Sequence, residues 1–247
     1  MGDFLRTAGL AKRFGNAEFA LAPADLAFGR GQFVAVIGPS GAGKTTFLRC
    51  MNRMIDPSEG RVFINGQCIS SMGKRELRRR IAMVFQQPNL VPRLSALDNV
   101  LIGRLGFMTG MRTLLPCFRR EDKMKALSAL DRVGMLEYAA TSCVSLSGGQ
   151  QQRVAVARAL AQEADVLLAD EPVASLDPEN AAKVMALLKD INQQDGVTVL
   201  VNLHQIDLAR QYANTIVAFK AGRVVYFGAG EAFMDEHYQK VFVTVAS

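Results

Sequence analysis

A glycine-rich stretch, Gly38-Pro39-Ser40-Gly41-Ala42-Gly43-Lys44-Thr45-Thr46, has the residue types and spacing needed to hold phosphate groups. It matches the pattern G-x-x-x-x-G-K-[ST] and lies between an apolar run at 32–37 and a helical pattern at 46–51. Glycines let the backbone curl so that successive N–H groups face an anion, and the following helix adds its positive end. Lys44 would bring a charge to the β- and γ-phosphates, and the Thr45 hydroxyl is suited to coordinate Mg²⁺. The stretch predicts a nucleoside-triphosphate site.

Polar residues follow three other apolar runs that have the pattern of buried strands. These runs end at Gln86, at Asp170 and Glu171, and at His204. Ligands of α/β sheets bind at the carboxyl ends of the strands, so these side chains are candidates for the same site. Asp170 is suited to hold Mg²⁺ through water, and Glu171 to orient or deprotonate an attacking water. His204 could sense a γ-phosphate by hydrogen bonding, although a lone histidine is more often structural.

A second loop-to-helix junction begins at Leu146-Ser147-Gly148-Gly149-Gln150. Ser147 can cap the helix, and the glycine pair makes its start another place where an anion could approach. Phe14, just before a turn at Gly15-Asn16, could stack on a base or belong to the core.

Length and composition set the protein class. The 247 residues suffice for one large α/β domain with inserted lobes, and 49% hydrophobic with 21% charged residues is ordinary for a folded protein. A net charge of +6 permits phosphate, headgroup or nucleic-acid contact without selecting one, and the basic run at 74–80 favours a solvated helix face. No apolar run approaches the roughly 20 residues of a membrane span. No signal peptide is visible, so we expect a chain that stays in the cytoplasm.

The cysteines show no paired spacing. Cys50, Cys68, Cys117 and Cys143 are far apart and form no C-x-x-C motif. We expect plain thiols in a reducing compartment rather than a metal site or disulfides.

The order of the elements indicates an inserted lobe. Residues 4–36 alternate like antiparallel strands, and a further strand is expected at 61–67. Residues 95–140 show helical patterns without a β-branched strand, apart from a connection at 106–116. A helix at 181–192, a buried strand at 197–203, a helix at 206–213 and a hairpin at 215–227 follow, and the tail after Phe227 has about twenty residues.

Over essentially its whole length the chain resembles the ATP-binding subunit of an ABC transporter. Residues 146–150 match the family signature LSGGQ as it stands. The resemblance implies an α/β fold: a P-loop NTPase (RecA-like) core with a mostly parallel sheet, an N-terminal antiparallel β subdomain and an inserted α-helical subdomain. It implies one domain over 1–247, with a β lobe at about 1–35 and 58–72, a nucleotide-binding core at 38–46 and 160–227, and a helical lobe at about 92–158.

The resemblance also implies a role for each motif. Gln86 becomes the Q-loop, Asp170 the Walker B residue, Glu171 the catalytic base, Asp177 part of the D-loop, and His204 the switch histidine. Expected nucleotide contacts are Phe14, Gly38, Pro39, Ser40, Gly41, Ala42, Gly43, Lys44, Thr45, Thr46, Ser147, Gly148, Gly149, Gln150 and Asp177. Expected Mg²⁺ ligands are Thr45, Gln86 and Asp170, and expected catalytic residues are Glu171, His204 and Gln86.

Two positions depart from the family pattern. Phe14 stands where tyrosine is common, which keeps the stacking but loses the hydroxyl. Gln205 follows the switch histidine where an acid is frequent, so the resemblance does not define some of the contacts around that histidine.

The working unit that the resemblance implies is a dimer of two copies with two ATP molecules and Mg²⁺ at their interface. Ser147 and Gly149 of one copy would face the γ-phosphate held by Lys44 of the other. The implied partners are integral membrane permease subunits and, indirectly, a periplasmic or extracellular solute-binding protein, with no nucleic acid. The implied location is peripheral, on the cytoplasmic face of the inner membrane.

Three segments, 86–95, 99–106 and 201–205, are similar to the ATPase of a phosphonate importer. Import of phosphate or of a polar amino acid is the main alternative. A soluble ABC ATPase that acts on ribosomes or DNA, and a scaffold that does not hydrolyse ATP, are further alternatives.

Overall fold

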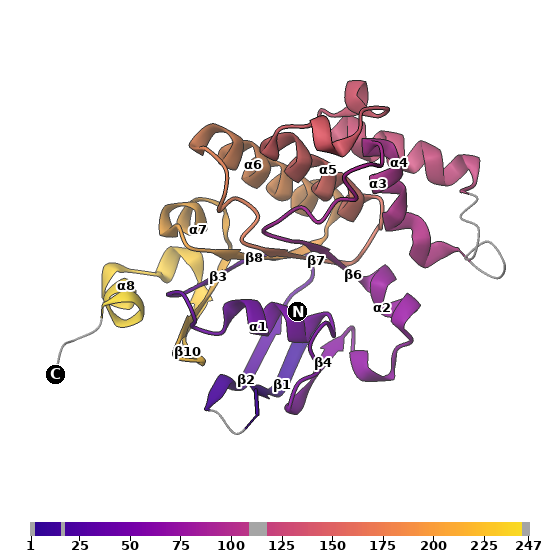
Figure 1. Cartoon of the computed structure of the whole chain (residues 1–247). Coiled ribbons are helices and arrows are strands. Elements are labelled where there is room, and N and C mark those ends of the chain that lie inside the picture. The colour runs from indigo at the N-terminus through magenta and orange to yellow at the C-terminus, as the bar shows by residue number, and fades with distance from the viewer. Residues whose placement is uncertain (1–2, 16–17, 109–117, 244–247) are drawn as a thin grey trace. The chain divides into compact units, whose positions relative to one another are not determined.

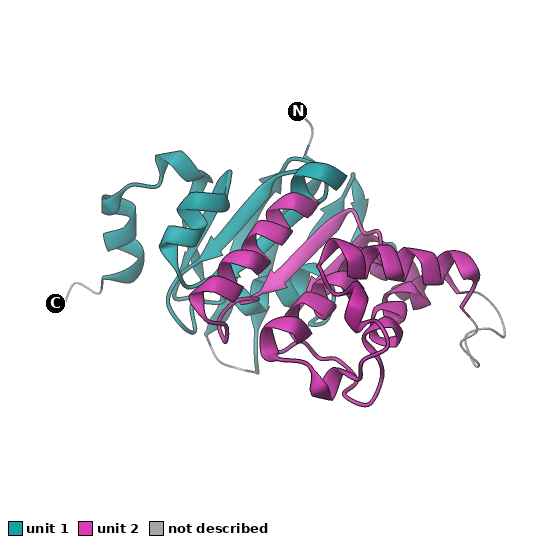
Figure 2. Cartoon of the chain, turned by 90° about the horizontal axis from the view of Figure 1, so that it is seen from above, with its two compact units in different colours: residues 1–73, 192–247 teal, residues 74–191 magenta. Residues whose placement is uncertain are grey.

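The structure, a computed structural model, describes residues 3–15, 18–108 and 118–243. The chain divides into two compact units, which Figure 2 colours separately. Unit 1 comprises residues 1–73 and 192–247, and unit 2 comprises residues 74–191. Most of the connection expected at 106–116 and the cysteine at position 117 lie outside the described residues.

Unit 1 contains a four-stranded antiparallel sheet formed by the N-terminal part of the chain (Figure 1). Its strands are β1 (Leu5–Arg13), β2 (Phe19–Phe28), β4 (Glu59–Ile64) and β5 (Gln67–Cys68), in the order β2-β1-β4-β5. Leu5 lies opposite Phe28 on one side and Ile64 on the other, and its side chain is fully buried. The antiparallel strands expected from the alternating pattern are confirmed.

A second group of strands in unit 1 is mainly parallel. β3 (Phe33–Ile37) pairs in parallel with β8 (Thr198–Leu203) on one side and with β9 (Thr215–Lys220) on the other. β10 (Arg223–Ala229) runs antiparallel to β9 and completes the expected terminal hairpin. Every residue of β3 and β8 is buried, as expected for parallel strands covered on both faces.

The α-helices that the structure describes in unit 1 are α1 (Lys44–Met51), α7 (Ile206–Tyr212) and α8 (Asp235–Phe242). The sequence pattern predicted the first two and left the tail without an element. Tertiary contacts hold α8 in place, because Tyr226 contacts the His237 ring at 4.7 Å between centroids. Lys220 Nζ also donates to the carbonyls of Lys240 at 2.7 Å and Val243 at 3.0 Å, at the end of α8.

Unit 2 combines one parallel strand pair with helices. β6 (Ile81–Val84) pairs in parallel with β7 (Val166–Asp170). The helices that begin in this unit are α2 (Lys74–Arg80), α3 (Ala96–Leu101), α4 (Arg120–Arg132), α5 (Gly148–Leu160) and α6 (Pro178–Asp195). Together with the strands of unit 1 they give the expected α/β class with mostly parallel pairing and inserted helices. In the described part of the chain, none of the helices has the length and apolar character needed to cross a bilayer.

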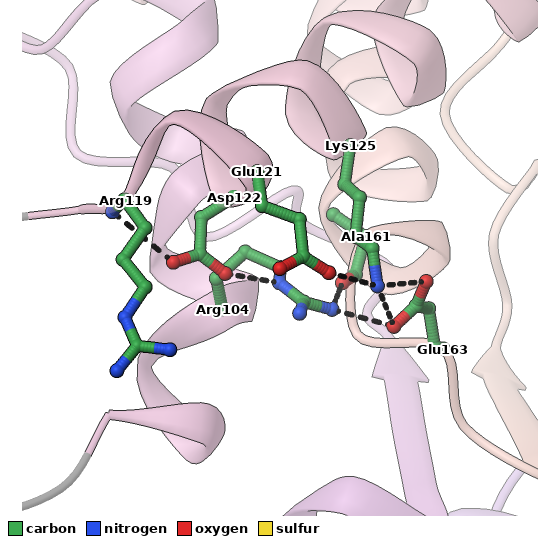
Figure 3. Close-up of polar contacts among 7 residues, drawn as sticks. All are labelled: Arg104, Arg119, Glu121, Asp122, Lys125, Ala161 and Glu163. Carbon is green, nitrogen blue, oxygen red and sulfur yellow. Dashed lines mark hydrogen bonds and ion pairs between the residues drawn. The ribbon is translucent and has the colours of Figure 1, made fainter.

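A buried arginine ties α4 to the segment that follows α5 (Figure 3). Arg104 is only 3% exposed, and its Nε donates to Asp122 Oδ1 at 3.0 Å. Its Nη1 donates to the Ala161 carbonyl at 2.9 Å and to Glu163 Oε2 at 2.8 Å. Lys125 Nζ lies 2.9 Å from the other oxygen of Glu163. Because the buried guanidinium is paired and hydrogen-bonded, its desolvation is compensated.

Candidate nucleotide site

The glycine-rich loop between β3 and α1 has a backbone that only glycine adopts easily. Gly38, Gly41 and Gly43 have φ angles of 146°, 75° and 100°. A Cβ on Gly38 would lie 2.2 Å from the Phe219 carbonyl oxygen, and one on Gly43 would lie 2.4 Å from that of Ala20. Glycine is therefore required at positions 38 and 43 both for conformation and for space.

Lys44 is folded into this loop. Its side chain is buried, with 4% of the residue exposed, and Nζ donates to the carbonyls of Gly38 at 2.8 Å and Pro39 at 3.0 Å. The ammonium therefore lies within the curve of the loop, at the start of α1, where the helix end is electropositive. This is the arrangement expected of a cradle for phosphate oxygens.

Two further residues of unit 1 lie at the same edge as the loop. Ile37 of β3 is in register with Leu203 of β8, so Gly38 and His204 both follow the carboxyl ends of adjacent parallel strands. The fully buried Asn202 of β8 donates from Nδ2 to Thr45 Oγ1 at 3.4 Å. Sequence reasoning missed Asn202, although an amide inside an otherwise apolar strand was an available signal.

Phe14 lies just past the end of β1 and is 51% exposed. Lys12 Nζ is 5.3 Å from the centre of its ring. The ring is therefore not a core residue, and its face remains suited to stack on a base.

In unit 2 the structure brings Gln86 and the acidic pair to one edge. Val84 of β6 is in register with Ala169 of β7, so both Gln86 and Asp170 lie near the carboxyl ends of adjacent strands. Asp170 is 5% exposed, which keeps the carboxylate close to the core. Glu171 has a φ of 51°, a left-handed conformation that costs about 1 kcal/mol or more for a residue with a side chain. Backbone strain of this kind is common at functional sites.

The loop that carries Gln86 is held by α5. Gln152, which is 2% exposed, donates from Nε2 to the Phe85 carbonyl at 3.2 Å. Arg158 donates from Nη1 to the Asn89 carbonyl and from Nη2 to the Pro88 carbonyl, both at 2.8 Å. The sequence did not predict these contacts, because they join residues about seventy positions apart.

The segment 146–150, hereafter the signature loop, forms the start of α5 with reciprocal capping. Ser147 Oγ accepts from the Gln150 backbone N–H at 3.3 Å, and Gln150 Oε1 accepts from the Ser147 backbone N–H at 2.9 Å. This capping box fixes the first turn of α5 and leaves the positive helix end at Gly148 and Gly149.

Asp177 caps the start of α6. Its Oδ1 accepts from the Asn180 backbone N–H at 3.0 Å, and its Oδ2 accepts from Asn180 Nδ2 at 2.6 Å. The side-chain hydrogen bond from Asn180, followed by the backbone one, lowers the pKa of Asp177. The helix therefore begins at Pro178 and not at residue 181 as expected from the sequence, because proline is favoured at the first helical position after a cap.

The predicted site residues are thus divided between the two units. Unit 1 holds Phe14, the loop 38–46 and His204, whereas unit 2 holds Gln86, the signature loop, Asp170, Glu171 and Asp177.

The residues expected to bind metal fit magnesium. Thr45, Asp170 and Gln86 offer hydroxyl, carboxylate and amide oxygens, and Mg²⁺ prefers oxygen donors. Mg²⁺ is usually held by one or two protein groups together with substrate phosphates, so it needs no dense acidic cage. Within the described residues, no group of three or more His, Cys, Asp or Glu side chains could hold a metal ion.

Comparisons with known proteins identify the class. The protein family described as "ABC transporter" matches residues 21–174. The chain belongs to the ABC transporter family, and the resemblance stated from its motifs is confirmed.

Individual members of this family are similar to the chain over most of its length. The "Phosphonates import ATP-binding protein PhnC 2" of Oceanobacillus iheyensis is 44% identical over 236 residues, covering 94% of this chain and 93% of that protein. The "Phosphonates import ATP-binding protein PhnC" of Shouchella clausii is 49% identical, covering 94% and 89%. Among solved structures, the dimeric post-hydrolysis state of the ATP-binding cassette MJ0796 bound to ADP and Pi is 36% identical with a TM-score of 0.79, covering 93% of this chain and 100% of that one.

Proposed function

We propose that this chain is the ATP-hydrolysing subunit of an ABC importer that takes up a phosphonate, or a related phosphorus oxyanion, through a separate membrane subunit. The observation that carries the proposal is the similarity to phosphonates import ATP-binding proteins, at 44% and 49% identity over 94% of the chain. Import of phosphate or of a polar amino acid stays the alternative, because the solute is selected by subunits outside this chain.

Within this function, each group of predicted site residues has its own role. The loop 38–46 and Lys44 bind the phosphates, and Phe14 stacks on the adenine. Thr45 and Asp170, with Gln86, would hold Mg²⁺, which neutralises phosphate charge when bound. Glu171 orients or deprotonates the attacking water, and His204 hydrogen-bonds the γ-phosphate.

The signature loop acts on the nucleotide of a second copy. Ser147 and Gly149 present the positive start of α5, and that helix end favours a γ-phosphate. A dimer with two shared sites closes when ATP bridges the copies and opens after hydrolysis removes the bridge. The dimeric state of the similar cassette MJ0796 supports this arrangement.

The membrane partners are integral membrane permease subunits, which receive the solute from a periplasmic or extracellular solute-binding protein. We place the chain peripherally on the cytoplasmic face of the inner membrane, in keeping with the import function in the names of its relatives. Gln86 and the loop that follows it would pass the closing motion to the permease.

Two measurements test the proposal. In the purified protein, Lys44→Ala should weaken ATP binding, whereas Glu171→Gln should keep ATP binding, nearly abolish turnover and trap a closed dimer. In proteoliposomes that contain the permease and the binding protein encoded by neighbouring genes, adding a phosphonate should raise the rate of ATP hydrolysis. Adding an amino acid should not raise it. Near-normal turnover in Glu171→Gln would remove the catalytic role, and stimulation by an amino acid alone would contradict the proposed solute.

A further inference from the structure

The first turns of α5 and α6 meet at Gly149 and Asn180. A Cβ built on Gly149 would lie 3.0 Å from both Cγ and Oδ1 of Asn180 and 3.4 Å from its Cβ. Gly149 is not among the glycines with a positive φ, so its backbone conformation is open to other residues. The Asn180 side chain, rather than the backbone, therefore favours glycine at position 149, because a Cβ there would make Asn180 shift by a few tenths of an ångström.

The Asn180 side chain is fixed by Asp177. Its amide Nδ2 donates to Asp177 Oδ2 at 2.6 Å, while the Asn180 backbone N–H donates to Asp177 Oδ1 at 3.0 Å. Both oxygens of one carboxylate thus hold one residue, and charge-assisted hydrogen bonds of this kind are stronger than neutral ones. Asn180 cannot turn away from Gly149 without breaking the shorter of these bonds.

The neighbouring glycine provides a comparison within the same loop. A Cβ on Gly148 would have no other atom within 4 Å, and Gly148 also has no positive φ. The two glycines of the signature loop therefore differ in one respect, the packing of Gly149 against Asn180.

We propose that Asn180 is a positioning residue that links the signature loop to Asp177. It holds Gly149 at a fixed distance from the Asp177 carboxylate, so the starts of α5 and α6 approach a nucleotide as one body. This inference rests on the proposed function, in which both segments meet the ATP of a second copy. Positioning of this kind matters because small displacements of groups around a reacting phosphate cost large factors in rate.

The first test measures the coupling between Gly149 and Asn180 in the absence of nucleotide. It compares the apparent Tm values of single and double variants. Gly149→Ala should lower Tm by about 2 to 6 °C, since the added Cβ overpacks against Asn180 and strains its hydrogen bonds to Asp177. The matched Gly148→Ala should not lower Tm and should raise it by about 1 to 4 °C, since alanine fits this backbone and restricts the unfolded chain. In an Asn180→Ala background, the loss caused by Gly149→Ala should fall to less than half, whereas the effect of Gly148→Ala should stay the same. Equal losses in both backgrounds, or equal effects of the two glycine substitutions, would overturn the link.

The second test separates positioning from folding. Asn180→Asp keeps the shape of the side chain but replaces its donor by an oxygen that faces the Asp177 carboxylate. We expect kcat for ATP to fall about tenfold. The ATP affinity of the purified protein should stay within about twofold, since the phosphate loop belongs to unit 1. The control Glu179→Ala, at the exposed neighbour that pairs with Lys183, should leave both values at wild-type levels.

The outcomes distinguish this inference from the proposed function. Unchanged kcat in Asn180→Asp, or a loss of ATP affinity as large as the loss of kcat, would overturn the positioning role. If the wild-type protein hydrolysed no ATP, the proposed function would fail, and the Tm comparison would still decide whether Asn180 links the two helix starts.

Discussion

Gln152 donates its side-chain amide N–H to the backbone carbonyl of Phe85 at 3.2 Å, and Phe85 directly precedes Gln86. Gln152 belongs to α5, the helix that begins in the signature loop. Arg158, further along the same helix, donates to two carbonyls of the loop after Gln86. A displacement of α5 therefore displaces the Gln86 loop, which gives the signature loop and the Q-loop a shared support within one unit.

Loss of this support is tested by Arg158→Met. The variant keeps an apolar stem but leaves the carbonyls of Pro88 and Asn89 without their charged donor. We expect a loss of about 2 to 4 kcal/mol in the free energy of unfolding. We also expect a lower kcat for ATP with little change in ATP affinity. Urea unfolding and steady-state kinetics measure the two effects.

The control for this variant is Arg132→Met. Arg132 pairs with Asp190 at 3.2 Å on a partly exposed surface, so its removal should cost at most about 1 kcal/mol. Comparable losses for Arg132→Met and Arg158→Met would contradict the special role of the α5 contact.

Ser147→Ala separates the helix cap from the action on nucleotide. Ser147 caps α5, and Ser95 caps α3 by the same hydrogen bond, accepted from the Asp98 backbone N–H at 3.0 Å. Both alanine variants should lose about 1 kcal/mol of stability. Only Ser147→Ala should also depress ATP hydrolysis, with ATP binding to the purified protein kept. If Ser95→Ala depressed hydrolysis to the same extent, the effect of Ser147→Ala would be structural.

Removal of Arg104 tests the network of Figure 3. Arg104→Met leaves the Asp122 and Glu163 carboxylates without their shared buried partner. Because Asp122 is largely shielded whereas Glu163 is about half exposed and keeps Lys125, the expected cost is about 1 to 3 kcal/mol. The exposed pair Lys183–Glu179 supplies the control, since Lys183→Met should cost less than about 1 kcal/mol. A loss below about 1 kcal/mol for Arg104→Met would show that the network adds little to the fold.

The same network predicts acid sensitivity. Burial raises the pKa of Glu163, but hydrogen bonds from Lys125 and Arg104 outweigh it, so the net pKa falls below its ordinary value of 4.5. A carboxyl with a depressed pKa in the folded state stabilises the protein above its unfolded pKa. That contribution is lost as the pH falls below about 4.5 toward the folded pKa. The stability difference between wild type and Glu163→Gln should therefore shrink from about pH 6 to acid pH in urea titrations. A constant difference would contradict the assignment.

The sequence predicted the elements that follow strong local patterns. The loop 38–46, the strand ends at Gln86, Asp170 and His204, and the helix start at Ser147 could be found because glycine spacing, apolar runs and caps act over a few residues. Family membership then followed from the order of these motifs and is confirmed by the comparisons.

Features that depend on tertiary contacts could not be predicted in the same way. The helix α8 was not predicted, although it has acidic residues in its first turn and a lysine in its last; Tyr226 and Lys220 from the preceding hairpin hold it. The packing of Gly149 against Asn180 also depends on a neighbour about thirty positions away in the sequence. The early start of α6 is different, because the cap at Asp177 and a proline at the first position were visible in the sequence.

A mixing experiment tests most directly whether two copies share each ATP site. Lys44→Ala damages the phosphate loop and Ser147→Arg damages the signature loop, so each variant alone should be nearly inactive. If the site is shared, a mixed dimer contains one site with both defects and one site with neither. An equal mixture should then recover about a quarter of the wild-type ATPase rate, since half of the dimers are mixed. If the mixture shows no more activity than the two variants measured separately, Lys44 and Ser147 act within one copy and the shared site is contradicted.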